Sequence, residues 1–385
     1  MPLTLSTTDL VPPRARDERF LGGALAVRSR SGLHPTEALL LERLPLLAPA
    51  PARVAVAGNR TGVLPAAVRL LFPQAAVVAH TTDAHHLAAI RRTLAGSGAA
   101  EGIACVNAAD LAPGADGLPF DAAVVQLSRN AMPAELVQDL LQNVHETLRD
   151  GGTCLLAFEG NAEWLRGQLK TVFGKTAVTV EGGLVFARAV RARPLPKLKN
   201  FEAVFDATLP GEAPFTLTTR PGVFSHRRPD QGGLALAEVA VHEATAADRV
   251  LDIGCGCGIV GIALARARPG LRVTFVDSDA RAAACAEANA HANGLKDFSV
   301  VCTDSGVAEK GFTLAVGNPP YFGNYAIAEL FIRNACDALA PGGRCLIVAK
   351  QSRWHEAFMA RCFGNAEPVR RRGYTVVRSV KTRHS

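Results

Sequence analysis

Residues 249–258 read RVLDIGCGCG, and residues 53–62 read RVAVAGNRTG. Each stretch begins with a short apolar run that gives way to glycine and polar residues, which is typical of a buried β-strand followed by a tight turn. The basic first residue, the apolar run and the turn fall at the same offsets in both. The two stretches therefore predict that one unit of structure occurs twice in the chain.

The segments that follow these two stretches also repeat in the same order. The second half continues with ARPGLRVTFVDSD, FTLAVGNPPYF and FIRNACDALAPGGRCLIVAKQS, and the first half with LFPQAAVVAHTTD, FDAAVVQLSRN and LLQNVHETLRDGGTCLLAFEGN. In both halves, short apolar runs alternate with helical stretches, many of them rich in alanine. This alternation predicts an α/β fold with two tandem Rossmann-like domains, each a parallel sheet covered on both faces.

Proline and mixed charge in residues 187–200, ARAVRARPLPKLKN, are typical of a linker. We predict domains at 1–190 and 201–385, joined by a linker at 191–200.

The composition favours a globular protein of the cytoplasm. The chain has 385 residues, of which 48% are hydrophobic, and no apolar run reaches the roughly 18 residues of a membrane span. Its start lacks the basic-then-apolar layout of a signal peptide. The nine cysteines are scattered, and Cys255 and Cys257 have no second pair at zinc-ligand spacing, so we expect buried thiols and no metal.

The net charge of +7 is concentrated near the N-terminus, between the halves, and in the tail, where Arg370, Arg371 and Arg372 are consecutive. Such clusters attract phosphate backbones. Charge alone leaves a nucleic-acid partner and a solvated basic surface equally open.

The two halves differ at the positions that would hold a ligand. In the second half, Asp252 ends the first strand, Gly254, Gly256 and Gly258 form the turn, and Asp277 and Asp304 follow the next two strands. Glycines let a ligand approach the backbone amides, and an acidic residue at the end of the second strand can accept hydrogen bonds from ribose hydroxyls. This pattern by itself also fits NAD or a purely structural turn. The first half has Val56, Asn59 and Thr81 at matching positions, so we expect its pocket to be lost.

The octapeptide VGNPPYFG, residues 316–323, ends the fourth strand of the second half. The side-chain oxygen of Asn318 and a backbone carbonyl fixed by Pro319 and Pro320 would give two acceptors for one planar NH2 group. Tyr321 can stack on a base. A neutral amine held in this way implies a methyl sulfonium electrophile, that of S-adenosylmethionine.

These motifs resemble those of class I amino-methyltransferases, in which D-x-G-x-G-x-G is followed by Asn-Pro-Pro-aromatic at the fourth strand. The segment PGVFSHRRPDQGGLALAEV from Pro221 is similar to that of the bacterial rRNA guanine-N2 methyltransferases of the RsmC/RlmG type. That family has two tandem methyltransferase-like domains, the first degenerate. The resemblance implies RNA binding and support by the first domain, catalysis by the second, and a monomer that acts on ribosomal RNA or a ribosomal subunit.

The resemblance also implies residue roles. A catalytic set would hold the target guanine, namely Asn318, Pro319, Pro320 and Tyr321. A second set would hold S-adenosyl-L-methionine, namely Asp252, Gly254, Gly256, Gly258, Asp277, Asp304 and Asn318.

The chain departs from the family pattern around the substrate pocket, where Tyr321 is followed by Phe322-Gly323-Asn324-Tyr325 and where Lys350 replaces the usual asparagine. Tyr325 would line the base pocket or pack under the loop, and Trp354 is expected to be a packing anchor. Adenine N6 or a protein glutamine stays open as the methyl acceptor. A non-catalytic RNA-binding factor that retains the cofactor pocket is the remaining alternative.

Overall fold

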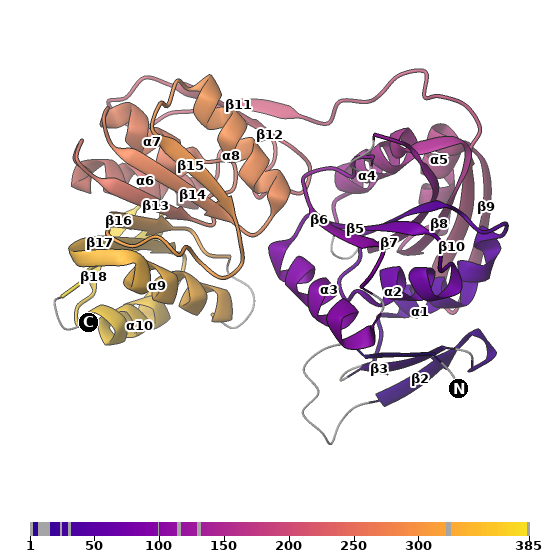
Figure 1. The fold of residues 1–385 in the computed structure, drawn as a ribbon. Helices are drawn as coiled ribbons and strands as arrows, with labels where there is room; N and C mark the ends of the chain where they lie inside the picture. Colours follow the sequence, from indigo (N-terminus) through magenta and orange to yellow (C-terminus); the bar gives the residue numbers. More distant parts are fainter. Residues whose placement is uncertain are drawn as a thin grey trace. The chain divides into compact units, whose positions relative to one another are not determined.

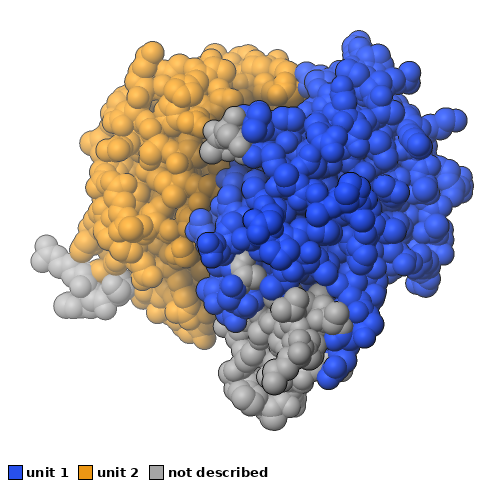
Figure 2. Space-filling view, turned by 45° about the vertical axis from the view of Figure 1, so that its right-hand side comes forward, with its two compact units in different colours: residues 1–201 blue, residues 202–385 orange. Residues whose placement is uncertain are grey.

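The computed structural model describes residues 3–6, 16–23, 25–29, 32–98, 100–113, 117–128, 132–320 and 325–382. The chain forms two compact units, Met1–Phe201 and Glu202–Ser385, which Figure 2 colours blue and orange. The segment 191–200, expected to be a linker, falls at the end of the first unit.

The first unit contains two sheets (Figure 1). A three-stranded sheet has the order β1-β3-β2 and a seven-stranded sheet the order β6-β5-β4-β7-β8-β10-β9. The elements are β1 (Leu3–Ser6), β2 (Arg16–Phe20), β3 (Leu25–Ser29), α1 (Pro35–Arg43), β4 (Arg53–Ala57), α2 (Val63–Leu71), β5 (Ala76–Thr81), α3 (Ala84–Ser97), β6 (Ile103–Asn107), β7 (Phe120–Ser128), α4 (Ala134–Thr147), β8 (Leu148–Glu159), α5 (Ala162–Phe173), β9 (Gly174–Glu181) and β10 (Leu184–Arg191).

The second unit opens with a two-stranded ribbon, β11-β12, and continues into a seven-stranded sheet of order β15-β14-β13-β16-β17-β19-β18. Its elements are β11 (Ala203–Ala207), β12 (Phe215–Thr219), α6 (Gln231–Glu243), β13 (Arg249–Ile253), α7 (Ile259–Ala267), β14 (Arg272–Asp277), α8 (Ala280–Ala292), β15 (Phe298–Cys302), β16 (Phe312–Gly317), α9 (Ala326–Ala338), β17 (Leu339–Ala349), α10 (Arg353–Phe363), β18 (Glu367–Arg371) and β19 (Tyr374–Val380).

The two large sheets have the same topology, strand for strand. In both, the first five strands in the order run parallel and a C-terminal antiparallel hairpin completes the sheet. The copies share a register irregularity, after Phe120 in β7 and after Phe312 in β16. An irregularity that recurs at the same place is a structural feature of the fold. Positions in the two units can therefore be compared by their place in the strand register.

Alternation along the strands places the core of the second unit on both faces of its sheet. In β13, Val250 packs in one cluster with residues of α6, α7 and α8, whereas Leu251 and Ile253 pack in another with residues of α9 and α10. Figure 1 shows these two groups of helices on opposite sides of the sheet. Because both faces are covered, the strands read as nearly continuous apolar runs, which is what made them visible in the sequence.

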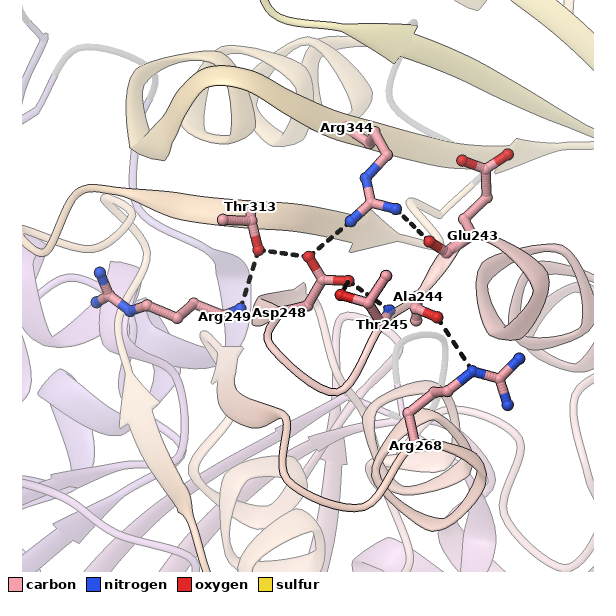
Figure 3. A network of polar contacts seen from close by, with 8 residues as sticks. All are labelled: Glu243, Ala244, Thr245, Asp248, Arg249, Arg268, Thr313 and Arg344. Atoms are coloured by element: carbon pink, nitrogen blue, oxygen red, sulfur yellow. Dashed lines mark hydrogen bonds and ion pairs between the residues drawn. The ribbon is translucent and has the colours of Figure 1, made fainter.

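A polar network fastens the amino-terminal edge of this sheet (Figure 3). Asp248, 5% exposed, accepts hydrogen bonds from Thr313 Oγ1 and Arg344 Nη2, each at 2.6 Å, and from the backbone amide of Thr245 at 2.7 Å. Burial raises the pKa of Asp248, but the bonds from Thr313, Thr245 and Arg344 outweigh burial and hold this pKa below its ordinary value. The network joins β16 and β17 to the loop before β13, at the edge opposite to the predicted ligand site.

No helix among the described residues is both long enough and apolar enough to cross a membrane.

Candidate cofactor and amine-binding site

The carboxyl ends of β13, β14, β15 and β16 bring the predicted site residues to one edge of the second sheet. Ile253 pairs with Val276 on one side and with Gly317 on the other, and Asp277 pairs with Cys302. The residues that follow these pairs are the glycine turn, Asp277, Asp304 and Asn318. Doubly wound folds bind ligands at this edge.

The glycine turn is fastened to the end of β14 by backbone hydrogen bonds. The amides of Gly254 and Cys255 donate to the carbonyl of Val276, at 2.8 and 3.0 Å. Asp277 Oδ2 accepts from the amide of Gly256 at 2.9 Å, and its Oδ1 accepts from the amide of Asp279 at 3.0 Å. The structure therefore brings together Gly256 and Asp277, two of the residues predicted to hold the cofactor.

The four glycines of this turn and the following helix differ in what surrounds them. A Cβ on Gly254 would lie 2.4 Å from the ring of Phe331, and one on Gly261 2.4 Å from Phe275. On Gly258, a Cβ would approach Ile262 at 3.1 Å. A Cβ on Gly256 would meet nothing within 4 Å, although its φ of +55° favours glycine. At the other three positions, packing or the turn thus requires a residue without a side chain. Gly256 is the position that faces open space.

Asp252 lies behind this turn and is 2% exposed. Its Oδ2 accepts a hydrogen bond from the amide of Gly261 at 2.9 Å, so the carboxyl joins the end of β13 to the first turn of α7. Burial raises its pKa to about 7, more than the bond from Gly261 lowers it. A direct role for Asp252 in cofactor binding stays a prediction.

Asp304 follows β15 by two residues and is half-buried. The amide of its neighbour Thr303 donates to the carbonyl of Asp277 at 2.9 Å, which holds this loop beside the end of β14. Asp304 thus lies at the same sheet edge as the other predicted cofactor residues.

Asn318 follows directly after β16, and its side-chain amide has one defined partner. Its Nδ2 donates to Oδ2 of Asp230 at 2.7 Å. The same oxygen accepts the amide of Gly233 at 2.5 Å, as the N-cap of α6. Because an ionised carboxylate only accepts hydrogen bonds, Asp230 fixes which end of the amide is nitrogen. The Oδ1 of Asn318 is therefore turned away from Asp230, and it is an acceptor.

The two prolines after Asn318 are fixed in place as well, since Pro319 is buried and Pro320 half-buried. Tyr321, the remaining residue of the predicted catalytic set, lies outside the described residues, as do Phe322, Gly323 and Asn324.

Register identifies Gln126 in the first unit as the counterpart of Asn318, because Ala57 pairs with Val125 as Ile253 pairs with Gly317. Its Nε2 donates to Thr36 Oγ1 at 3.0 Å, in the first turn of α1. In both units, therefore, the side-chain amide after this strand pair donates to the N-terminal end of a helix, α6 in the second unit and α1 in the first.

The corresponding turn of the first unit, residues 58–62, differs from that of the second unit in its side chains. A Cβ on Gly58 would lie 2.1 Å from the carbonyl oxygen of Gln126, so the turn and the end of β7 are in close contact. Asn59 is fully buried, and its Oδ1 accepts the amides of Thr61 and Gly62. Arg60 stands at the position of Gly256, so the first unit has a long side chain where the second unit has the glycine that faces open space.

Sequence reasoning missed two residues of the site, Asp230 and Phe331. Asp230 directly precedes a helix and so carries an N-cap signal, but its contact with Asn318 spans 88 positions and has no local signature. Phe331 of α9 lies against the Cβ positions of both Gly254 and Gly317.

No group of three or more His, Cys, Asp or Glu suited to a metal ion occurs in the described part of the chain.

Residues 214–378 match the family model of the methyltransferase small domain. The chain is 35% identical over 178 residues to the ribosomal RNA small subunit methyltransferase C of Chromohalobacter salexigens, which covers 44% of this chain and 53% of that protein. It is 29% identical over 268 residues to the protein of the same name from Pseudomonas putida, covering 65% of this chain and 76% of the relative. The chain thus spans about half the length of the first of these relatives and about three quarters of the second.

The structure is also similar to that of the T. thermophilus 16S rRNA N2 G1207 methyltransferase (RsmC) in complex with AdoMet and guanosine. The TM-score is 0.72 at 24% sequence identity, over 96% of this chain and 98% of that one. At this identity the match establishes the fold. The predicted α/β fold with two tandem Rossmann-like domains is confirmed, and the matched relatives bear out the predicted resemblance.

Proposed function

We propose that this chain, whose residues 214–378 match the methyltransferase small domain, is an S-adenosyl-L-methionine-dependent enzyme that methylates the exocyclic N2 amine of a guanine in ribosomal RNA. The observation that carries this proposal is the orientation of Asn318. Its Nδ2 is held by Asp230 at 2.7 Å, so that its Oδ1 is the atom presented to a substrate.

The cofactor site fits an adenosine-containing ligand. The open face at Gly256 leaves room for a close approach to the backbone, and Asp277 stands at the end of the second strand, where a carboxylate can accept from ribose hydroxyls. When bound, S-adenosylmethionine supplies an electrophilic methyl group. The residues expected to hold it are Asp252, Gly254, Gly256, Gly258, Asp277, Asp304 and Asn318.

The amine is held by acceptors. An exocyclic amine carries two protons, and Asn318 Oδ1 together with a backbone carbonyl next to Pro319 can receive both of them. This orientation directs the nitrogen lone pair, and positioning of this kind supplies several kcal/mol of barrier reduction. The amine is neutral and scarcely basic, so its proton needs to leave only as the new bond forms, and no strong base is required at the site. Tyr321 would stack on the guanine.

The substrate is supported by the relatives. Two matched proteins are named as methyltransferases of small-subunit ribosomal RNA, and the matched structure of similar fold holds AdoMet and guanosine. We further propose that the first unit, which has Arg60 and Thr81 at the positions of Gly256 and Asp277, supports RNA binding, and that the protein acts as a cytoplasmic monomer on ribosomal RNA or the small subunit.

The proposal is tested with the full chain in two steps. Isothermal titration should detect S-adenosylmethionine binding. Asn318→Ala should lose methyl transfer to ribosomal RNA, because it removes the amine acceptor, and should largely retain cofactor affinity, because the other six residues expected to hold the cofactor are unchanged. Arg272→Ala is the control, since Arg272 begins β14 at the opposite edge of the sheet. Binding of NADH in place of S-adenosylmethionine, or unchanged turnover by the Asn318 variant, would contradict the assignment.

A further inference from the structure

A basic cavity of about 950 Å³ lies in the second unit, at the same sheet edge as Asn318. Its walls come from the residues after β17 and from the β18–β19 hairpin, with Tyr325 from the start of α9. Gly317 pairs with Ile347 and Ala349 with Thr375, so the cavity begins beside β16. Adjacent strands are about 5 Å apart, which places this wall one to two strand spacings from Asn318.

The charge in this cavity is strongly positive. Five cations line it, namely Lys350, Arg353, Arg370, Arg371 and Arg372. One carboxylate, that of Glu238, pairs with Arg371 at 3.2 Å and with Arg372 at 2.5 Å. No ion pair to an acidic side chain is found for Lys350, Arg353 or Arg370 among the described residues. Three exposed cations without a carboxylate partner are suited to phosphate groups.

An aromatic stack reaches into the same cavity. Phe358 is buried in the core, Trp354 stacks on it at 5.0 Å and 9°, and Tyr325 stacks on Trp354 at 4.6 Å and 10°. Tyr325 is 39% exposed, so this stack ends in an accessible ring that is held rigidly from below. Trp354 is therefore a packing anchor, as expected, and it also supports a surface on which a base can stack.

Two residues that line the cavity, Tyr325 and Arg372, have positive φ, +67° and +47°. For Arg372 this value belongs to the hairpin turn, because Arg371 pairs with Tyr374 and the turn residues Arg372 and Gly373 both have positive φ. The cavity is therefore assigned from its charge and its stacked rings.

We propose that this cavity is a subsite for an RNA nucleotide next to the methylated guanosine, with its base stacked on Tyr325 and its phosphates bound by Lys350, Arg353 and Arg370. This inference rests on the proposed function, because it places the flanking part of the same RNA strand. It also accounts for Lys350, where this chain departs from the family pattern, as a cation that supports phosphate binding.

The test uses the full chain and two probes, ribosomal RNA from a strain that lacks the protein and a short single-stranded RNA with one guanosine. Tyr325→Ala should weaken the affinity for both RNAs about 5- to 150-fold, and Tyr325→Phe should restore it because stacking needs only the ring. Arg370→Ala and Arg353→Ala should each lower the slope of log affinity against log salt by about 0.7 to 0.9. Arg272→Ala, on the opposite edge, should lower it less.

Cofactor affinity and thermal unfolding are measured on every variant, so that a folding defect is recognised. If wild-type protein methylates guanosine and the variants bind both RNAs with unchanged affinity and salt slope, the subsite is refuted while the proposed function stands. If wild-type protein fails to transfer a methyl group but the variants lose RNA affinity as described, the subsite stands and the proposed activity fails.

Discussion

Replacing Asp230 tests whether it orients the Asn318 amide. In Asp230→Ala, two bonds are lost, the 2.7 Å bond from Asn318 Nδ2 and the 2.5 Å bond from the amide of Gly233. The second is an N-cap, whose loss costs about 1 kcal/mol of stability. The first joins an amide to a carboxylate, a class of bond that contributes about 1.5–3 kcal/mol. Once it is lost, the amide can turn over and present its NH2 group to the substrate amine, donor against donor.

If the orientation free energy of about 1.5–3 kcal/mol is lost in the transition state, kcat should fall by roughly 10- to 150-fold. Cofactor affinity should change little, because Asp230 does not lie in the glycine turn. In Asp230→Asn the side-chain oxygen can still accept both bonds, because a single oxygen of Asp230 accepts both, so stability should stay close to wild type and kcat should fall less than in Asp230→Ala. The assay is steady-state methyl transfer, with kcat and KM separated, beside isothermal titration of the cofactor.

The matched control is Asp83→Ala in the first unit, where Asp83 caps α3 by accepting the amides of His85 and His86. It should lose a similar amount of stability and keep its kcat. A kcat for Asp230→Ala within twofold of wild type, or an equal loss in both variants, would refute the reasoning that Asp230 orients the amide.

Three further predictions concern the scaffold of the site. Asp248→Ala should lower the free energy of unfolding by about 3–5 kcal/mol at pH 7, because Arg344 loses its buried partner. The stabilisation requires the ionised carboxylate, whose pKa is lowered in the native state, so wild type should lose it as pH falls below about 4. An effect of the substitution under 1 kcal/mol in chemical denaturation would contradict this. Asp252→Asn should gain stability relative to wild type as pH rises from 5 to about 7, by roughly 3 kcal/mol, because over this range the unfolded wild-type chain is ionised at Asp252 while the native state, with its raised pKa of about 7, still holds the proton. A difference independent of pH would count against this. Gly256→Ala should lower cofactor affinity with only about 1–2 kcal/mol of destabilisation from its φ of +55°, whereas Gly261→Ala should mainly destabilise because its Cβ would overlap Phe275; equal cofactor affinity in Gly256→Ala and wild type would show that its open face is not the ligand face.

The fold could be predicted because its evidence is local and occurs twice. The apolar runs that became β13 and β4 are buried on both faces, so each strand is continuous in the sequence and needs no partner to be recognised. The turn after each strand has a fixed conformation that glycine supplies, as at Gly258 and Gly62, both with positive φ. Repetition of these signals at a constant offset predicted the duplicated architecture.

The site could be predicted only in part, because its decisive contacts join distant segments. The sequence named Asn318 and the chemistry of its amide, but not which end of the amide faces the substrate. That depends on Asp230, which belongs to a helix that lies before β13 in the chain. Likewise, four glycines looked alike in the sequence. Only the structure shows that Gly254 and Gly261 pack closely against Phe331 and Phe275, whereas Gly256 faces open space.

The stacking role of Tyr325 shows the same limit. Whether its ring lines a pocket or packs beneath a loop depends on Trp354, which lies 29 positions later, and on how the two rings are oriented. No periodicity encodes that geometry, since the two residues lie at the starts of separate helices, α9 and α10.

The most direct test of the proposed activity is mass mapping of small-subunit ribosomal RNA after incubation with the purified protein and S-adenosylmethionine, using RNA from a strain that lacks the protein. We predict one new methyl group on the N2 atom of a single guanosine, absent when Asn318→Ala replaces wild type. A methyl group on adenine N6, or RNA that gains no methyl group while the protein binds the cofactor, would contradict the assignment of Asn318 to a guanine amine.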